Sequence, residues 1–411
     1  MSQTAGAGDS IYRRGFGLKQ EVAGELVEDY HSPLVDYLQQ NGYELETENV
    51  HVLLAREYGF CYGVDRAVDY AYESRRKFPD RRLFLTTEII HNPRVNRRLM
   101  EMGIRFLSGQ YASGTAVEDL RPEDVVLLPA FGVSTAELER LRKTGCVIVD
   151  TTCGSVANVW RRVEHYAREG YTSLIHGKYD HEETIATCSR AESSIGSKYL
   201  VVRDRAEAES VCDYIRGNGN RLRFLETFAH SCSKGFDPDL HLQKVGVANQ
   251  TTMLSSESLE IADRIRQAFV DRYGEEESDK RFLSFDTICS ATQDRQDAVI
   301  EMTQRDIDLM IVVGGFNSSN TGHLCEIAAE HFPSFHIDDV SRIEGGSRIV
   351  HKKPLSDEIL VTENWLPEGF CRIGFTAGAS TPNLVVGKVI AEVLRLKGIN
   401  RDSHLLFLLQ A

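Results

Sequence analysis

The sequence predicts an α/β protein built from three similar units, and two observations support this fold class. First, short apolar runs end in loops rich in Gly, Ser, Thr and Asn, and a helical pattern follows, as in "LMIVVGGFNSSNTGHLCEIAAE". Continuous apolar strands are typical of parallel sheets that are buried on both faces. Second, three cysteines share one local arrangement at wide spacing: a strand, a small polar turn, the cysteine, then a helix. We therefore expect three α/β units with mostly parallel sheets.

The 411 residues are long enough for two or three domains. Residues 1–49 contain helical stretches but no apolar core of a signal peptide, and they are too acidic for a typical organelle transit peptide. We interpret them as an N-terminal extension ahead of the first strand. The expected organisation is an extension over 1–49, α/β units over 50–152, 153–283 and 284–390, and a C-terminal tail over 391–411.

Composition and charge exclude several classes of protein. The formal net charge of −14 argues against a general nucleic-acid binder, which would carry a basic field. No apolar run approaches the roughly 18–20 residues that a membrane span requires. Nine cysteines in a large chain without a secretory signal do not indicate a disulfide framework. A reducing compartment is expected, where cysteines serve as core residues, metal ligands or catalytic thiols.

Cys61, Cys153 and Cys289 are the three cysteines with the shared arrangement. They follow "HVLLAREYGF", "GCVIVDTT" and "RFLSFDTI" respectively, and each is followed by a helical pattern. A helix start favours a thiolate. Three such thiolates fit a [4Fe–4S] cluster with one open iron, or a catalytic zinc with an exchangeable position. The alternative is that these three are buried cysteines with no common purpose. Cys146 and Cys325 lack the shared arrangement, and we interpret them as core or surface residues.

Two further loops carry histidines at strand ends. "TTEIIHNPRVNRRL" places His91 before a proline that starts a helix, where it suits an anion or a simple cap. "IHGKYDHEETIAT" places His181 two positions before Glu183, a spacing that allows the pair to handle protons together. A surface charge cluster is the alternative for this second loop.

Three donor-rich loops suit an oxyanion such as a diphosphate. In "GGFNSSNTGHL", two glycines let the backbone approach a ligand before a helix start. "TAGAST" and "ANQTT" are similar strand ends. The candidate donors of the three loops are Asn317, Ser318, Ser319, Asn320, Thr321, Ser380, Thr381, Gln250, Thr251 and Thr252. Ordinary helix capping is the alternative. No Walker sequence or dinucleotide fingerprint is present, so the phosphate need not belong to a nucleotide.

Taken together, these motifs resemble the 4-hydroxy-3-methylbut-2-enyl diphosphate reductase family, which performs the last step of the methylerythritol phosphate route to isoprenoids. The matching motifs occur in order from about residue 50 to 390 and are "GFCYGVDRAV", "EIIHNPRVNRRL", "DTTC", "HEET", "QTT", "TICSATQDRQDAV", "VGGFNSSNT" and "TAGASTP". "IYRRGFG" and "HGKYDHEET" are similar to the plant and cyanobacterial branch.

The resemblance implies a trefoil of three α/β units around one [4Fe–4S] cluster. It implies Cys61, Cys153 and Cys289 as ligands, with one iron open to the substrate hydroxyl. Glu183 matches the residue that delivers a proton, and Thr251 matches its neighbour. The residues that match diphosphate contacts are His91, His181, Ser318, Ser319, Asn320 and Ser380.

The resemblance also implies partners and a compartment. The electron donor is expected to be ferredoxin, with flavodoxin as the alternative, and neither nucleic acid nor membrane is an expected partner. The compartment is the bacterial cytoplasm, or the plastid stroma if the chain is a processed plant-type protein. Native donor, oligomeric state and product ratio stay open at this level.

Two positions depart from the family pattern. Phe131 stands where many bacterial members have a histidine, so one expected diphosphate donor is missing. Gly154 replaces the usual proline after Cys153, which should loosen the helix start.

Three other functions compete with this interpretation. A quinolinate-synthase-like dehydratase would share a three-cysteine cluster but not the ordered "HEET", "QTT" and "NSSNT" motifs. A zinc hydrolase would place histidine and carboxylate ligands closer together in sequence. A redox sensor with an exposed cluster would not need the diphosphate donors.

Overall fold

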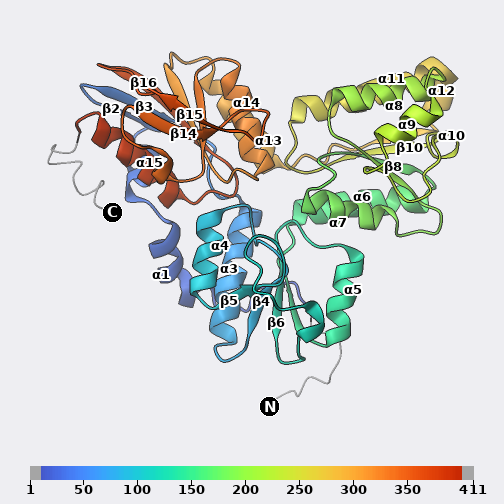
Figure 1. Cartoon of the computed structure of the whole chain (residues 1–411), viewed down its shortest axis with the longest axis horizontal. Helices are drawn as coiled ribbons and strands as arrows, with labels where there is room; N and C mark the ends of the chain where they lie inside the picture. The colour runs from blue at the N-terminus through green and yellow to red at the C-terminus, as the bar shows by residue number, and fades with distance from the viewer. Residues whose placement is uncertain (1–10, 400–411) are drawn as a thin grey trace. The chain divides into compact units, whose positions relative to one another are not determined.

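The computed structural model describes residues 11–399 and contains three β-sheets with helices packed on them (Figure 1). The central strands of every sheet pair in parallel, which confirms the predicted α/β class with mostly parallel sheets. Residues 1–10 of the predicted extension and 400–411 of the predicted tail lie outside the described residues. Within residues 11–399, no helix is both long and apolar enough to cross a membrane.

The described chain divides into two compact units, each assembled from separate stretches of sequence. Compact unit 1 holds residues 11–14, 81–87 and 105–289, and compact unit 2 holds residues 15–80, 88–104 and 290–399. The three α/β units expected from the sequence differ from these two bodies, and β3 of the expected first unit lies in the same sheet as the strands of the expected third unit. Their boundaries at residues 50, 153 and 284 stay a prediction.

Compact unit 1 carries two of the sheets. The five-stranded sheet has the order β1-β7-β6-β4-β5, and the four-stranded sheet has the order β11-β10-β8-β9. The strands are β1 (Ile11–Tyr12), β4 (Leu83–Leu85), β5 (Ile104–Phe106), β6 (Val125–Leu128), β7 (Val147–Asp150), β8 (Thr172–His176), β9 (Tyr199–Val202), β10 (Val245–Asn249) and β11 (Phe282–Ser284). The helices are η1 (Val117–Asp119), α5 (Thr135–Thr144), α6 (Gly154–Arg168), α7 (Glu182–Ala191), α8 (Arg205–Arg216), α9 (Arg221–Thr227), α10 (Pro238–His241), α11 (Ser255–Tyr273) and α12 (Glu275–Ser278).

The four-stranded sheet is covered on both faces, as its continuous apolar strands require. Figure 1 shows α8 and α11 on one face and α6 and α7 on the other. Along β8, Leu174 packs in the core that includes α8 and α11, whereas the next residue, Ile175, packs against Cys188 of α7. Successive side chains of a strand point to opposite faces, so each face needs its own apolar cover.

Compact unit 2 carries the seven-stranded sheet, with the order β15-β14-β13-β12-β16-β3-β2. Its strands are β2 (Glu44–Glu46), β3 (Val50–Leu54), β12 (Leu309–Val313), β13 (Ser334–Ile337), β14 (Arg348–Lys352), β15 (Ile359–Glu363) and β16 (Cys371–Ala377). Its helices are α1 (Lys19–Tyr30), α2 (Pro33–Gln40), α3 (Tyr62–Lys77), α4 (Pro93–Glu101), α13 (Ser290–Met302), α14 (Ser319–Ala329), η2 (Val340–Arg342) and α15 (Asn383–Leu396). The four central strands are parallel, and the pairs at both edges are antiparallel.

The core of compact unit 2 forms on both faces of this sheet. In β12, Ile311 belongs to the core shared with α15, while Met310 and Val312 belong to the core shared with α13 and α14. Figure 1 shows these helices on opposite sides of the strands. The continuous apolar run in the sequence is therefore a strand buried on both faces.

The predicted extension contributes strands as well as helices. The pair β1–β7 adds Ile11 and Tyr12 to the five-stranded sheet, and β2 pairs antiparallel with β3. The strand β3 itself pairs in parallel with β16, near the other end of the chain. The seven-stranded sheet therefore joins the start of the expected first α/β unit to the end of the third.

Candidate active site

Cys61, Cys153 and Cys289 all lie at the junction between a strand and a helix start, which confirms their predicted local structure. Cys61 and Cys153 are the N-cap residues of α3 and α6, and Cys289 directly precedes α13. All three side chains are half-buried. Neither Cys61 nor Cys153 caps its helix through its side chain. The thiols therefore lie at the positive ends of helices, where a thiolate is stabilised.

Most of the other cysteines occupy a different environment. Cys146, Cys188, Cys212, Cys325 and Cys371 are buried, and Cys232 is half-buried. Burial raises the pKa of Cys212 and of Cys325 to about 12, so these thiols stay protonated at neutral pH. Three thiols at helix starts therefore differ from the protonated thiols of the core. Cys61, Cys153 and Cys289 are suited to bind a metal centre that has thiolate ligands.

In compact unit 2, the loop that carries Cys61 is fixed against the end of β16. The backbone N–H of Cys61 donates to the carbonyl of Ala379 over 3.2 Å, and that of Gly59 donates to Ala377 over 3.3 Å. Gly59 has φ +71°, and a Cβ there would lie 2.7 Å from Asn383 Oδ1. Only glycine fits this turn without strain. Cys61 is therefore held beside the "TAGAST" loop.

Four of the predicted diphosphate residues form a connected group in compact unit 2. Ser318 caps α14, since its Oγ accepts from the N–H of Thr321 over 3.3 Å and from the hydroxyl of Thr321 over 3.0 Å. The O–H of Ser318 is a donor that these two bonds do not use. Asn320 Oδ1 accepts from the N–H of Ala379 over 2.9 Å, which joins α14 to the loop of Ser380. Ser319 is buried in the first turn of α14.

The buried amide of Asn320 indicates a ligand with an oxygen acceptor. Asn320 is 2% exposed, and within residues 11–399 its Nδ2 has no hydrogen-bond partner. Leaving such a donor unpaired costs about 1–3 kcal/mol, so sites of this kind usually receive a water or a ligand. A phosphate oxygen would satisfy it.

His91 is oriented by neighbours that the sequence did not reveal. Its Nδ1 lies 3.3 Å from Glu88 Oε2, and the amide of Asn317 donates to the same carboxylate oxygen over 3.1 Å. The carbonyl of His91 accepts from the hydroxyl of Ser380 over 3.2 Å. A Cβ on Gly315 would lie 2.3 Å from this carbonyl, so glycine permits the close approach. The ring of His91 and the glycine-rich loop therefore form one packed arrangement.

The glycine-rich loop that contains Gly314 and Gly315 contacts a buried histidine, His336. Its Nε2 lies 3.0 Å from the carbonyl of Gly314, to which it donates, and the side chain is 2% exposed. Burial lowers the pKa of His336 to about 4, so the ring is neutral at physiological pH.

In compact unit 1, Glu183 and Thr251 form a doubly hydrogen-bonded pair. Glu183 Oε1 accepts from the backbone N–H of Thr251 over 2.6 Å, and Oε2 accepts from its hydroxyl over 2.9 Å. Glu183 is 2% exposed, so this carboxyl group is almost fully removed from water. The carbonyl of Thr251 accepts from the N–H of Cys289 over 3.2 Å. The residue Thr251, just after β10, thus connects the carboxyl group of Glu183 to Cys289, a predicted cluster ligand.

His181 caps α7 and supports the same carboxylate residue. Its Nδ1 accepts from the N–H of Glu183 over 3.1 Å. Because Nδ1 is an acceptor, the proton of the neutral ring is on Nε2, which suits donation to an anion. Gln250 ties this loop to β10, since its Oε1 accepts from the N–H of Lys178 over 3.0 Å and the hydroxyl of Thr184 over 3.1 Å.

The two departures from the family pattern are accommodated locally. Phe131 is 7% exposed, and its ring meets that of His181 edge to face, with centroids 6.2 Å apart. It therefore supports the histidine ring instead of adding a donor. Gly154 begins α6, and a Cβ there would meet no atom within 4 Å. Other residues would therefore fit at this helix start.

The site residues thus fall into two sets. Compact unit 1 supplies Cys153, His181, Glu183, Thr251 and Cys289, and compact unit 2 supplies Cys61, His91, Ser318, Ser319, Asn320 and Ser380. Sequence reasoning missed Glu88 and Arg295, a buried arginine of α13 that donates to the Cys61 loop. Charged residues are usually exposed, and no local signal marked Glu88, in the loop after β4, or Arg295, in a helical pattern, as buried.

These observations define an α/β protein in which thiols, a buried carboxyl group and donors suited to an anion lie at strand ends and helix starts. A model of the family described as LytB protein matches residues 52–394. The chain belongs to the LytB family.

Curated relatives and solved structures agree with this assignment. A 4-hydroxy-3-methylbut-2-enyl diphosphate reductase of Gloeobacter violaceus is 50% identical over 96% of this chain and 94% of its own length. A protein of the same name from Thermosynechococcus vestitus is 47% identical over 95% of this chain and 96% of its own length. The solved structure of (E)-4-hydroxy-3-methyl-but-2-enyl diphosphate reductase, the terminal enzyme of the non-mevalonate pathway, is 26% identical, with a TM-score of 0.51 over 84% of this chain and 99% of that chain. The Plasmodium falciparum E-1-hydroxy-2-methyl-but-2-enyl-4-diphosphate reductase shares the fold, at 21% identity and a TM-score of 0.60 over 84% of this chain and 87% of that chain.

Proposed function

We propose that this chain is a 4-hydroxy-3-methylbut-2-enyl diphosphate reductase. It removes the hydroxyl group of its substrate reductively and gives isopentenyl and dimethylallyl diphosphate, the last step of the methylerythritol phosphate pathway. The observation that carries the proposal is the nearly full-length likeness to reductases of this name, at up to 50% identity among the relatives above. The buried pair of Glu183 and Thr251 supports it, because loss of a hydroxyl group requires a proton.

We further propose that Cys61, Cys153 and Cys289 hold one [4Fe–4S] cluster at the centre of a trefoil of three α/β units. The support is their shared position at helix starts, where thiolates are stabilised, in contrast to the protonated thiols of the core. Three ligands would leave one iron open. When bound, the cluster would supply the electrons and a Lewis-acidic iron for the substrate hydroxyl.

The remaining site residues have separate proposed roles. Glu183 delivers the proton to the leaving hydroxyl group, and Thr251 holds the carboxyl group in place through two hydrogen bonds. The diphosphate is held by Ser318, Ser319, Asn320, Ser380, His91 and His181. Support comes from the O–H of Ser318, which its two accepted bonds leave available, and from the buried amide of Asn320, which has no partner within residues 11–399. Binding the diphosphate also requires the hydroxyl of Ser380 to turn from the carbonyl of His91, to which it donates.

The electron donor is proposed to be a ferredoxin, with a flavodoxin as the alternative carrier. The compartment is proposed to be the bacterial cytoplasm, or the plastid stroma for a processed plant-type chain. The likeness to proteins of cyanobacteria supports both proposals. Comparing turnover with each reduced carrier distinguishes the two donors.

The experiment that tests the function combines metal analysis with turnover. Protein purified without oxygen should contain about four irons and four sulfides per chain and should convert the hydroxylated diphosphate in the presence of a reductant. A loaded protein that leaves this substrate unchanged would refute the proposed activity. Zinc in place of iron would refute the cluster.

A matched variant separates catalysis from structure. Glu183→Gln should keep the iron content and lose most of the turnover, because the amide cannot deliver a proton. Equal loss of iron and turnover would instead give Glu183 a structural role. Glu182→Gln, at the neighbouring residue of α7, is the control.

A further inference from the structure

Arg295 makes an unusual set of contacts with the loop that precedes Cys61. The side chain is 4% exposed, and its Nη2 donates to three successive carbonyls, of Tyr58 over 3.4 Å, Gly59 over 2.7 Å and Phe60 over 3.2 Å. Its Nη1 donates to the carbonyl of Ala291, one turn earlier in α13, over 2.7 Å. One guanidinium therefore joins α13 to the Cys61 loop.

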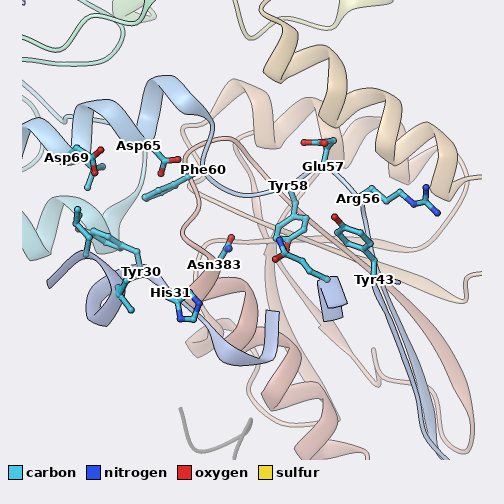
Figure 2. Close-up of a pocket in the computed structure, with 14 residues that line it drawn as sticks. Tyr30, His31, Tyr43, Arg56, Glu57, Tyr58, Phe60, Asp65, Asp69 and Asn383 are labelled. Atoms are coloured by element: carbon cyan, nitrogen blue, oxygen red, sulfur yellow. The ribbon is translucent and has the colours of Figure 1, made fainter. Parts of the chain in front are cut away.

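The bonds of Arg295 satisfy the carbonyls of a loop whose N–H groups at Gly59 and Cys61 donate to Ala377 and Ala379. The positive φ of Gly59 turns the neighbouring carbonyls toward one side, where the guanidinium lies. Tyr58 and Phe60 also line a cavity of about 470 Å³ that α1, α3 and α15 share (Figure 2). The Tyr58 ring also packs in the core of compact unit 2 and its hydroxyl accepts from Gln39 over 2.8 Å, while Phe60 contacts the ring of Tyr30. The hydrogen bonds of Arg295 therefore add to this packing by fixing the backbone between the two side chains.

The charge of Arg295 is also not neutralised by an ion pair. Within residues 11–399, no carboxylate lies in salt-bridge contact with this guanidinium. Arg295 does act on Asp65 of α3, where it opposes the rise in pKa that burial causes. A buried cation that donates to carbonyls is stabilised by anionic groups that lie nearby. The carboxyl group of Asp65 is one such group, and a cluster bound by thiolates would be a second.

We infer that Arg295 is a positioning residue of the iron–sulfur site, which fixes the Cys61 loop and offsets the negative charge of the cluster. α13 begins one residue after Cys289, so the helix that carries Arg295 also follows a second proposed ligand. The inference rests on the proposed function, since the charge effect requires the cluster. The effect of Arg295 on the position of the Cys61 loop involves the polypeptide alone, so it is also present in the protein without a cluster.

The test compares Arg295→Gln and Arg295→Lys with the parent protein. Arg295→Gln removes the charge and the guanidinium fork, whereas Arg295→Lys keeps the charge and loses the fork. Arg272→Gln is the control, since Arg272 of α11 donates to a single carbonyl, that of Ile215, over 2.7 Å. Two quantities are measured: the midpoint potential of the loaded cluster in an EPR-monitored titration, and the alkylation rate of Cys61 in the apoprotein by mass spectrometry.

In Arg295→Gln, the potential should become more negative, with about a tenfold lower ratio of reduced to oxidised cluster at a fixed potential, or about 59 mV. Arg295→Lys should keep a potential near that of the parent. Alkylation of Cys61 should become about tenfold faster in both variants, because each loses bonds to the loop, and the control should match the parent in both measurements.

An unchanged alkylation rate in both variants would overturn the positioning role, and an unchanged potential in a fully loaded Arg295→Gln protein would overturn the charge role. If Arg295→Gln does not fold, Arg295→Lys still tests the loop. If the parent binds no cluster, the proposed function fails, while the alkylation experiment on the apoprotein still decides the positioning role.

Discussion

Replacing Thr251 with valine isolates one of the two hydrogen bonds that hold the carboxyl group of Glu183. The two side chains have nearly the same shape, so Thr251→Val removes the hydroxyl donor at 2.9 Å from Oε2 and keeps the backbone donor at 2.6 Å from Oε1. A hydrogen bond to a charged group contributes about 1.5–3 kcal/mol. If the bond orients the carboxyl group in the transition state, its loss should lower kcat about 10- to 150-fold.

The assay is steady-state turnover of the diphosphate substrate by dithionite-reduced protein without oxygen, at matched iron content. Thr251→Ser is the control, because it keeps the hydroxyl group and loses only a methyl group, and its kcat should stay within about threefold of the parent. Thr251→Val should also have little further effect when Glu183 is already glutamine, since the two residues act as a unit. Parent-like turnover by Thr251→Val, or fully additive losses in the double variant, would refute this role.

Three further outcomes are expected. Gly154→Pro should raise the free energy of unfolding by about 0.5–1 kcal/mol in chemical denaturation. Cys153 has ψ 143°, which suits a residue before proline, and a Cβ at position 154 would meet no atom within 4 Å. A loss of stability would show that the helix start needs glycine. The folded pKa of His336, about 4, lies below its unfolded value, so stability is lost as pH falls from about 6.5 toward 4. The free energy of unfolding should therefore fall between pH 7.5 and pH 5 by about 2 kcal/mol more in the parent than in His336→Gln. An equal fall in the two proteins would contradict the burial argument. Cys289→Ser should lower the iron and sulfide content, while Cys325→Ser, in the buried part of α14, should keep the parent content; the reverse pattern would exclude Cys289 as a ligand.

Local patterns in the sequence predicted the parts of the fold that depend on local physics. An apolar run followed by a polar turn and a helical pattern placed the three cysteines at helix starts, where α3, α6 and α13 begin. The same pattern predicted Ser318 at the start of α14. These features follow from backbone geometry within about ten residues.

Long-range contacts were not predictable in this way. Arg295 meets carbonyls more than 230 positions earlier, and the polar pattern around it is that of an exposed helix. Glu88 gave no sign that it would orient His91 together with Asn317. The strand β1 has two residues, too few for any periodicity to mark it. Such contacts depend on the tertiary arrangement, which a single sequence leaves open.

The pairing of β3 with β16 has a consequence for the order of events during synthesis. The two strands lie about 320 positions apart in the chain, so β3 meets its parallel neighbour only when nearly the whole polypeptide has left the ribosome. The N–H groups of Gly59 and Cys61 donate to the carbonyls of Ala377 and Ala379, so the loop of Cys61 reaches its final position at the same late stage. A cofactor that needs this thiol would therefore be inserted into the completed chain, after translation, and not into a nascent domain.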